Sequence, residues 1–262
     1  LAPSEMCIRD RLEPAQIAEL TRTSLAGWPL QADWQGMKIV ISAGGTQEDL
    51  DPVRYLGNRS SGRQGFALAE LASQRGAEVV LVAGNVEDLP VPAGARVVRV
   101  TSTRDMLGAM LAESADADVV IMSAAVADYR PATVAESKMK KGADDANLSR
   151  LELVENPDIL KTLVGKRAAG ELPGHQVLVG FAAETGDENH TAVELAQAKL
   201  ERKGCDVLMA NEVGRGKVFG QLDNQGWLLT PGAEPQEVAY GTKQVVAAQI
   251  LAAVDRVMDA AK

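Results

Sequence analysis

Apolar and polar residues alternate in blocks along most of the chain, and the blocks have the lengths of strands and helices. From residue 37 onward, short runs rich in Val, Ile and Leu alternate with stretches whose apolar residues recur every three or four positions. The short runs predict buried strands, and the longer period predicts amphipathic helices. We expect strands at residues 38–42, 78–83, 96–100, 118–125, 176–183 and 205–210. We expect helices at residues 61–75, 101–114 and 191–203, another that begins near Pro157, and a last one that ends at Lys262.

Single helices separate most of these strands, which indicates right-handed βαβ crossovers and a mainly parallel sheet. The predicted fold class is therefore α/β, with a doubly wound, Rossmann-like sheet. Two segments interrupt the alternation. Residues 132–149 are polar and rich in Lys, so we interpret them as a flap. Residues 218–239 predict a β-hairpin extension with its turn at residues 223–226.

The same patterns divide the chain into three regions. Residues 1–12 resemble translated sequencing-adapter sequence, and we expect them to be non-native. Residues 13–36 hold a short amphipathic stretch and then a polar connector with Trp28 and Trp34, which we interpret as a linker or docking arm. Residues 37–262 form the predicted domain.

Composition and charge limit the classes of function. The formal net charge of −9 argues against broad nucleic-acid binding, although a few Lys residues can still form a local anion pocket. No apolar run approaches the roughly 20 residues that span a bilayer, so we expect no membrane partner. Cys7 and Cys205 form no CxxC pair, and the two His residues are too few for a His-rich metal site. A reducing, cytoplasmic location fits best.

A Gly-rich turn and a helix start form the first candidate site. Gly44-Gly45-Thr46 follows the first strand, and Ser60-Ser61-Gly62 precedes the first helix of the domain. Ligands of doubly wound folds bind outside the carboxyl ends of strands, and a helix N-terminus suits phosphate. From these residues alone, phosphate binding and simple helix capping are equally good interpretations. Arg54, between the two motifs, could clamp a carboxylate or phosphate, but a solvent-facing Arg is the more common role.

Other candidates stand where further predicted strands end or in the flap. Asp128 follows the most hydrophobic strand and could accept from ribose hydroxyls or hold Mg²⁺ through water, or it could cap the loop. Lys138 and Lys141 of the flap suit polyphosphate, although Lys residues in loops are usually solvated. Each motif is modest by itself, but the parallel arrangement would bring several of them to one edge of the sheet.

Three more candidates have an ordinary structural explanation beside the functional one. In residues 156–159, Asn156 near the N-cap and Pro157 at the first helical position explain the motif as capping. Phe181 could contact a nucleobase, although a lone Phe near a core is more often packing. Lys199 and Lys203 lie on one helix face, where an anionic ligand or plain solvation would explain them.

Seven ordered motifs from residue 37 onward resemble those of the phosphopantothenate–cysteine ligase family. They are Ser-Ala-Gly-Gly-Thr (42–46), Asp-Pro-Val-Arg (51–54), Asn-Arg-Ser-Ser-Gly (58–62), Ala-Ala-Val-Ala-Asp-Tyr (124–129), Lys-Met-Lys-Lys (138–141), Asn-Pro-Asp-Ile (156–159) and Gly-Phe-Ala-Ala-Glu-Thr (180–185). The resemblance implies ligation of 4′-phosphopantothenate to L-cysteine with CTP and Mg²⁺, through an acyl-cytidylate, in coenzyme A biosynthesis. It also implies a homodimer with shared sites, and we expect residues 218–239 to contribute to its interface. A flavin-dependent decarboxylase domain would precede this one in the full-length chain, so no flavin is expected in this fragment.

The resemblance also implies roles for individual residues. The catalytic residues would be Asn58, Arg54, Lys138 and Lys141. The nucleotide would be bound by Met122, Ser123, Ala124, Asp128, Lys138, Asn156, Pro157, Asp158, Ile159, Phe181, Lys199 and Lys203. The loop for phosphate and the acyl substrate would comprise Gly44, Gly45, Thr46, Ser60, Ser61, Gly62 and Ala125. Gln47 departs from the Arg often found there in the family, which puts an anion contact by that Arg in doubt.

Two alternative functions use the same predicted sheet. A dinucleotide-binding oxidoreductase is disfavoured because the first turn lacks the glycine fingerprint and no acid ends the second strand, where Ala83-Gly84-Asn85 stands. A non-enzymatic nucleotide sensor would bind CTP without releasing pyrophosphate.

Overall fold

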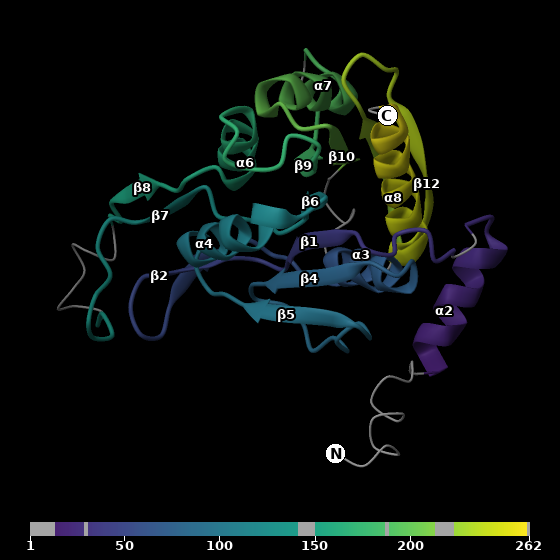
Figure 1. Cartoon of the computed structure of the whole chain (residues 1–262). Coiled ribbons are helices and arrows are strands. Elements are labelled where there is room, and N and C mark those ends of the chain that lie inside the picture. The colour runs from purple at the N-terminus through teal and green to yellow at the C-terminus, as the bar shows by residue number, and fades with distance from the viewer. Residues whose placement is uncertain (1–13, 29–30, 141–149, 187–188, 213–222, 261–262) are drawn as a thin grey trace.

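The computed structural model describes residues 14–28, 31–140, 150–186, 189–212 and 223–260. Within these residues, the main sheet has eight strands in the order β12-β11-β10-β9-β6-β1-β4-β5 (Figure 1). The parallel strands are β1 (Lys38–Ala43), β4 (Glu78–Ala83), β5 (Ala95–Arg99), β6 (Val119–Met122), β9 (Val177–Glu184) and β10 (Val207–Glu212). At one edge, β11 (Asp223–Leu229) and β12 (Gln236–Thr242) run antiparallel. The predicted mainly parallel α/β fold is confirmed.

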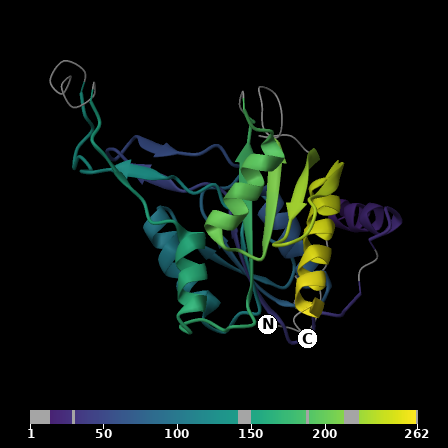
Figure 2. The same ribbon diagram turned by 90° about the horizontal axis from the view of Figure 1, so that it is seen from above.

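Helices cover both faces of this sheet (Figure 2). One face is covered by α3 (Arg63–Gln74) and α8 (Lys243–Ala260), and the other by α4 (Thr103–Glu113), α6 (Ile159–Ala168) and α7 (Ala192–Lys203). Successive residues of β1 show why both faces need cover. Ile41 belongs to the core under α3 and α8, whereas Val40 belongs to the core that contains Met106 of α4. Strands buried on both faces read as continuous apolar runs, which made them easy to predict.

Two small antiparallel sheets extend away from the main sheet (Figure 2). One pairs β2 (Gln47–Asp49) with β3 (Tyr55–Gly57), and the other pairs β7 (Tyr129–Pro131) with β8 (Leu153–Glu155). The pattern of the sequence did not predict these four strands. Residues 132–140 of the predicted flap contain neither helix nor strand, and residues 141–149, including Lys141, lie outside the described residues.

The hairpin formed by β11 and β12 is confirmed, but its predicted turn is wrong. Residues 223–226 belong to β11, and the chain reverses at Thr230–Ala233, where the Ala233 N–H donates to the Thr230 carbonyl at 3.2 Å. Gly232 has a φ of +75°, as the third position of a type II turn requires. Gly226 instead lies against the next strand: a Cβ there would be 2.1 Å from the Ala210 carbonyl oxygen.

The predicted cap of α6 is also displaced. Asp158, not Asn156, is the N-cap, and its Oδ1 accepts from the Lys161 N–H at 3.0 Å. Asn156 is buried and donates to the Ala127 carbonyl at 2.9 Å, so its amide ties two loops together. Two other helices begin with a capping box, α4 at Ser102 and α7 at Thr191.

Residues before β1 pack onto the domain. Helix α2 (Pro14–Leu25) contacts α8, as Figure 1 shows. Trp34 is only 2% exposed, its indole N–H donates to Asp255 at 2.8 Å, and the Arg75 guanidinium lies 3.9 Å from its ring centroid. Among the described helices, none combines the length and the apolarity that a membrane span needs.

Candidate active site

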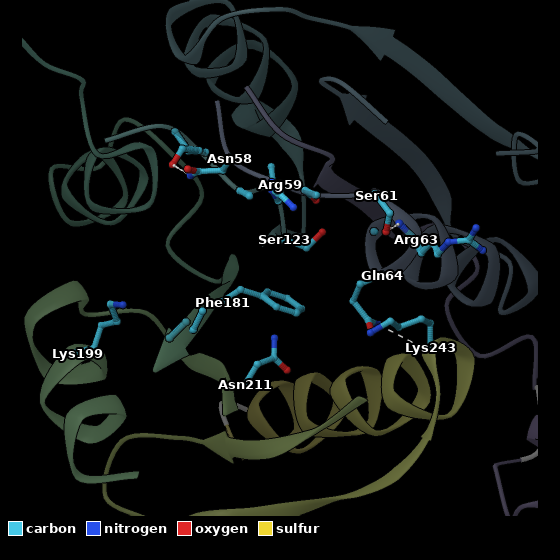
Figure 3. A pocket seen from close by; sticks show the side chains of 18 residues that line it. Asn58, Arg59, Ser61, Arg63, Gln64, Ser123, Phe181, Lys199, Asn211 and Lys243 are labelled. Atoms are coloured by element: carbon cyan, nitrogen blue, oxygen red, sulfur yellow. Dashed lines mark hydrogen bonds between the residues drawn. The ribbon is translucent and has the colours of Figure 1, made fainter. Parts of the chain in front are cut away.

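A pocket of about 610 Å³ lies where β6, β9 and β10 end, beside the N-terminus of α3 (Figure 3). Ligands of open α/β sheets bind in this position. In Figure 3, the Phe181 ring reaches into the middle of the pocket from β9, and Ser61 and Arg63 lie on the opposite side. The described lining residues are Asn58–Gly65, Ser123–Val126, Phe181–Ala183, Lys199, Asn211 and Lys243.

The N-terminus of α3 provides donors to this pocket. Its N-cap, Gly62, has a φ of +80°, and a Cβ there would be 2.5 Å from the Val86 Cγ1 atom, so both the conformation and the space require glycine. Gly62 has no side chain to cap the helix, and the Arg63 N–H makes only a long hydrogen bond, at 3.5 Å, to the Ser61 hydroxyl. The next backbone N–H groups, those of Gln64 and Gly65, therefore suit a ligand, and they lie at the positive end of the helix dipole. This geometry suits a phosphate group.

The charge of the pocket differs in sign from that of the whole chain. Among its described lining residues, four are cationic and none is a carboxylate: Arg59, Arg63, Lys199 and Lys243. Carboxylates outside the lining hold two of these cations, since Arg63 Nη2 lies 2.6 Å from Glu87 and Lys199 Nζ lies 2.6 Å from Glu184. The walls are therefore positive within a chain of net charge −9, which favours an anionic ligand.

Small residues bring the strand ends and α3 close together behind the pocket. A Cβ on Gly65 would lie 2.5 Å from the Ala43 Cβ atom, so α3 can approach β1 only with glycine at this position. The Ser123 hydroxyl donates to the Ser42 carbonyl, and the Ala124 N–H donates to the Ser42 hydroxyl at 3.1 Å. These bonds join the ends of β1 and β6 and fix the backbone that faces a ligand.

Asn58 is held by one of its two amide N–H groups. Its Nδ2 donates to the Val126 carbonyl at 2.9 Å, which joins the loop after β3 to the loop after β6. An asparagine amide carries two N–H donors, so one remains for a ligand oxygen.

The structure brings nine of the predicted site residues together in the pocket lining. They are Asn58, Ser60, Ser61, Gly62, Ser123, Ala124, Ala125, Phe181 and Lys199. Four others support the pocket without lining it: Gly44, Gly45, Thr46 and Met122. A Cβ on Gly44 would meet the Asn85 carbonyl oxygen at 2.3 Å, and the buried Thr46 hydroxyl accepts from the Ala127 N–H at 2.9 Å. These contacts are structural.

Several predicted residues do not line the pocket within this single chain. They are Arg54, Asp128, Lys138, Asn156, Pro157, Asp158, Ile159 and Lys203. Lys203 forms an ion pair with Asp158, the N-cap of α6, and Ile159 is part of the core. Lys138 and Asp128 are exposed on the segments around β7.

Five polar or charged lining residues were not among the site residues predicted from the sequence: Arg59, Arg63, Gln64, Asn211 and Lys243. Arg59 and Arg63 directly flank Ser60-Ser61-Gly62, and Asn211 stands near the end of a predicted strand, so the rule on strand ends could have found them. Lys243 begins α8, far along the chain, and no local pattern marks it. The Gln64 amide nitrogen donates to the Lys243 carbonyl at 3.2 Å, and its buried Oε1 has no partner among the described residues.

The described walls of the pocket contain no magnesium site of their own. Proteins usually bind Mg²⁺ through one or two carboxylates together with substrate phosphates. The described lining contains no carboxylate, and no cluster of three or more His, Cys, Asp or Glu residues in the described part of the chain could hold a metal.

The sheet order, the parallel crossovers and the cationic pocket at the strand ends define a doubly wound α/β protein with a site for an anionic ligand. The chain belongs to the family described as the DNA/pantothenate metabolism flavoprotein C-terminal domain, which matches residues 34–258.

Relatives with this domain are similar over most of the chain. The coenzyme A biosynthesis bifunctional protein CoaBC of Mycobacterium bovis is 47% identical over 225 residues, which is 86% of this chain and 53% of the relative. The protein of the same name from Vibrio vulnificus is 40% identical over 249 residues, 94% of this chain and 58% of the relative. The chain thus spans about half the length of these relatives.

A solved structure confirms the architecture. The crystal structure of the C-terminal domain of coenzyme A biosynthesis bifunctional protein CoaBC is 37% identical, with a TM-score of 0.70. The match covers 87% of this chain and 99% of that structure.

Proposed function

We propose that this chain is an acid–amine ligase of coenzyme A biosynthesis, which joins 4′-phosphopantothenate to L-cysteine at the expense of CTP. One observation carries the proposal: a single cationic pocket gathers Asn58, the Ser60-Ser61 turn, the N-terminus of α3, Phe181 and Lys199. The relatives named as coenzyme A biosynthesis bifunctional proteins support the choice of pathway. By resemblance, a flavin-dependent decarboxylase domain would belong to the full-length chain and not to this fragment.

The proposed reaction needs activation because a carboxylate is a poor electrophile and its charge repels nucleophiles. In the first half, the carboxylate oxygen attacks the α-phosphorus of CTP, and the bond to pyrophosphate breaks. This gives an acyl-cytidylate. In the second half, the cysteine amine attacks the acyl carbon, loses a proton and displaces CMP, which leaves the amide. Such chemistry depends on positioning the reactants and stabilising developing negative charge.

The lining residues suit these tasks. The N–H groups of the first turn of α3 and the hydroxyls of Ser60 and Ser61 would bind a phosphate group. Phe181 would stack on a nucleobase, and Lys199 would neutralise part of the nucleotide charge. The remaining N–H of Asn58 would donate to the acyl oxygen as charge develops on it, so we propose Asn58 as a catalytic residue.

Predicted residues that do not line the pocket of the single chain also have proposed roles. Lys138 and Lys141 of the flap, with Arg54, would act on the acyl intermediate, and Asp128 and Lys203 would contact the nucleotide, as the family resemblance implies. A homodimer with shared sites, also implied by the resemblance, would add residues of a second copy. The proposed ligase uses Mg²⁺ as a companion of the CTP phosphates.

A steady-state assay tests the proposal directly. Pyrophosphate release should require CTP, 4′-phosphopantothenate and L-cysteine together, and replacing CTP with ATP or UTP measures the base preference. Asn58→Ala should lower turnover by roughly 10²–10³-fold, the cost of losing one oxyanion donor. Its unfolding midpoint serves as the control for an intact fold. Binding of CTP without any pyrophosphate release would favour a nucleotide sensor and refute the ligase.

A further inference from the structure

Asp51 is a buried carboxylate that lies outside the pocket and has no role in the function proposed above. Its side chain is 0% exposed. Its Oδ1 accepts from the backbone N–H groups of Val53 at 2.8 Å and Arg54 at 2.9 Å. Its Oδ2 accepts from Arg54 Nε at 3.0 Å and from Arg54 Nη2 at 2.6 Å. Asp51 and Arg54 therefore form one rigid ion pair at the tip of the β2–β3 hairpin.

This ion pair also holds both backbone polar groups of one residue in the flap. The Met139 N–H donates to Asp51 Oδ2 at 3.2 Å, and Arg54 Nη2 donates to the Met139 carbonyl at 2.8 Å. A second bond fixes the same segment four residues earlier, where the Ala135 N–H donates to the Leu50 carbonyl at 3.0 Å. Residues 135–139 therefore follow the turn at residues 50–54 and are attached to it at both ends.

The residues on either side of Met139 carry the charge of the flap. Lys138 and Lys140 are both exposed, whereas Met139 between them is partly buried. Fixing the Met139 backbone fixes the Cα positions from which both lysine side chains extend. A charged side chain on an anchored backbone loses less conformational freedom when it meets an anion.

The carboxylate of Asp51 is ionised near neutral pH. The hydrogen bond from Arg54 is the largest cause, desolvation opposes it, and the N–H groups of Val53, Arg54 and Met139 assist it; together they hold the pKa of Asp51 far below its usual range. The ion pair therefore does not open as pH changes near neutrality.

We propose that Asp51, acting through Arg54, is a positioning residue that anchors Met139 and thereby directs Lys138 and Lys140 toward the polyphosphate of the nucleotide. The inference rests on the proposed function for the identity of the anion. It gives Arg54 a structural task, the bond to the Met139 carbonyl, in addition to the contact with the acyl intermediate proposed above.

Limited proteolysis tests the anchor without any substrate. We expect trypsin to cleave the Lys138–Met139 bond when the Met139 N–H is released, so that cleavage follows the population of the open segment. Asp51→Asn should speed cleavage of this bond roughly tenfold, as followed by mass spectrometry. The matched control is Asp206→Asn, because Asp206 also pairs with an arginine, Arg167, and accepts a backbone N–H, that of Leu178 at 2.7 Å. This control should leave cleavage at Lys138 unchanged, and an unchanged rate in Asp51→Asn would overturn the anchor.

A double-mutant cycle tests whether the anchor acts through the lysines. In the wild-type background, Asp51→Asn should lower ligation by roughly tenfold to a hundredfold, as misplaced catalytic groups do. In a Lys138→Gln/Lys140→Gln background, the same change should have little further effect. Penalties that simply multiply would overturn the positioning role.

A second variant and two combined results distinguish failure of the anchor from failure of the proposed function. If Asp51→Asn fails to fold, Arg54→Lys keeps the charge but loses the fork that reaches the Met139 carbonyl, and both measurements apply to it with the same expectations. If Asp51→Asn is cleaved faster but the wild-type protein shows no ligation, the proposed function and the polyphosphate target of the lysines are refuted, whereas the anchor is supported. Normal cleavage in an active enzyme would refute the anchor alone.

Discussion

The ammonium nitrogen of Lys199 lies 2.6 Å from Oε1 of Glu184, which joins α7 to the end of β9. The two side chains are only 26% and 17% exposed. Lys199 lines the pocket, whereas Glu184 does not. The carboxylate therefore holds the cation in place from behind, and the hydrogens of the ammonium group that do not face it remain for an anionic ligand.

Removing the charge of Lys199 should weaken nucleotide binding. Lys199→Met keeps the length of the side chain but removes a hydrogen bond to a charged group, which is worth about 1.5–3 kcal/mol. The KM for CTP should rise roughly tenfold to a hundredfold, measured by pyrophosphate release at saturating phosphopantothenate and cysteine. Lys166→Met is the matched control, since Lys166 also pairs with a glutamate, Glu171, but does not line the pocket. Equal KM values for the two variants would remove Lys199 from the nucleotide site.

Gly62→Ala should lower both stability and phosphate affinity. A residue other than glycine costs about 1–2 kcal/mol in the left-handed conformation, and the new Cβ would also lie 2.5 Å from the Val86 side chain. Gly170→Ala separates the cost of the left-handed conformation from the cost of the contact with Val86, because Gly170 has a φ of +76° with open space around it. Urea unfolding should show a larger loss for Gly62→Ala than for Gly170→Ala, and only the former should weaken CTP binding. Equal losses would show that the contact with Val86 relaxes.

The strands at the centre of the sheet were predictable because their pattern is local. The strand expected at residues 78–83 is observed with these bounds as β4, since a strand buried on both faces needs apolar side chains at every position. The capping boxes at Ser102 and Thr191 are local in the same sense, because each joins residues three positions apart. The pocket lies where these strands end, so predicting the strands also predicted much of the pocket lining.

The features that were missed depend on contacts between distant segments. The strands β7 and β8 have three residues each, and Tyr129 pairs with Glu155 across the flap, so no periodic pattern could appear. The missed turn of the hairpin is different, because Pro231-Gly232 is a local turn pattern that was available. The role of Arg54 was also beyond the sequence: its partner Met139 lies 85 positions away.

The stability contributed by Asp158 should depend on pH. Burial opposes its ionisation most strongly, but the hydrogen bonds from Lys203 and from the Lys161 N–H, with the charges of both lysines, outweigh it and lower the pKa of Asp158. A carboxyl whose pKa falls on folding stabilises the protein at neutral pH, and this contribution is lost as pH falls through about 4 and below.

Asp158→Asn isolates the charge of Asp158, because asparagine is an equally good N-cap. The free energy of unfolding in urea should fall by about 0.5–1 kcal/mol at pH 7, and the difference from wild type should shrink as pH falls below about 4. Asp158→Ala should add a loss of about 1 kcal/mol from the missing cap, which remains at low pH. A difference between wild type and Asp158→Asn that stays constant from pH 7 to pH 3 would contradict the pKa shift.

Trp34 should be one of the most important residues for stability, although it precedes the first strand of the domain. Its side chain is 2% exposed between α3 and α8, with Arg75 over its ring and its indole N–H bonded to Asp255. Removing a large buried aromatic side chain costs about 3–5 kcal/mol, because a cavity remains, so Trp34→Ala should shift the urea midpoint strongly. Trp28→Ala is the control from the same connector, where the ring is only partly buried and the loss should be smaller. If both variants unfolded at the same urea concentration, the connector would not be part of the folded domain, and its packing against α3 and α8 would contribute nothing to stability.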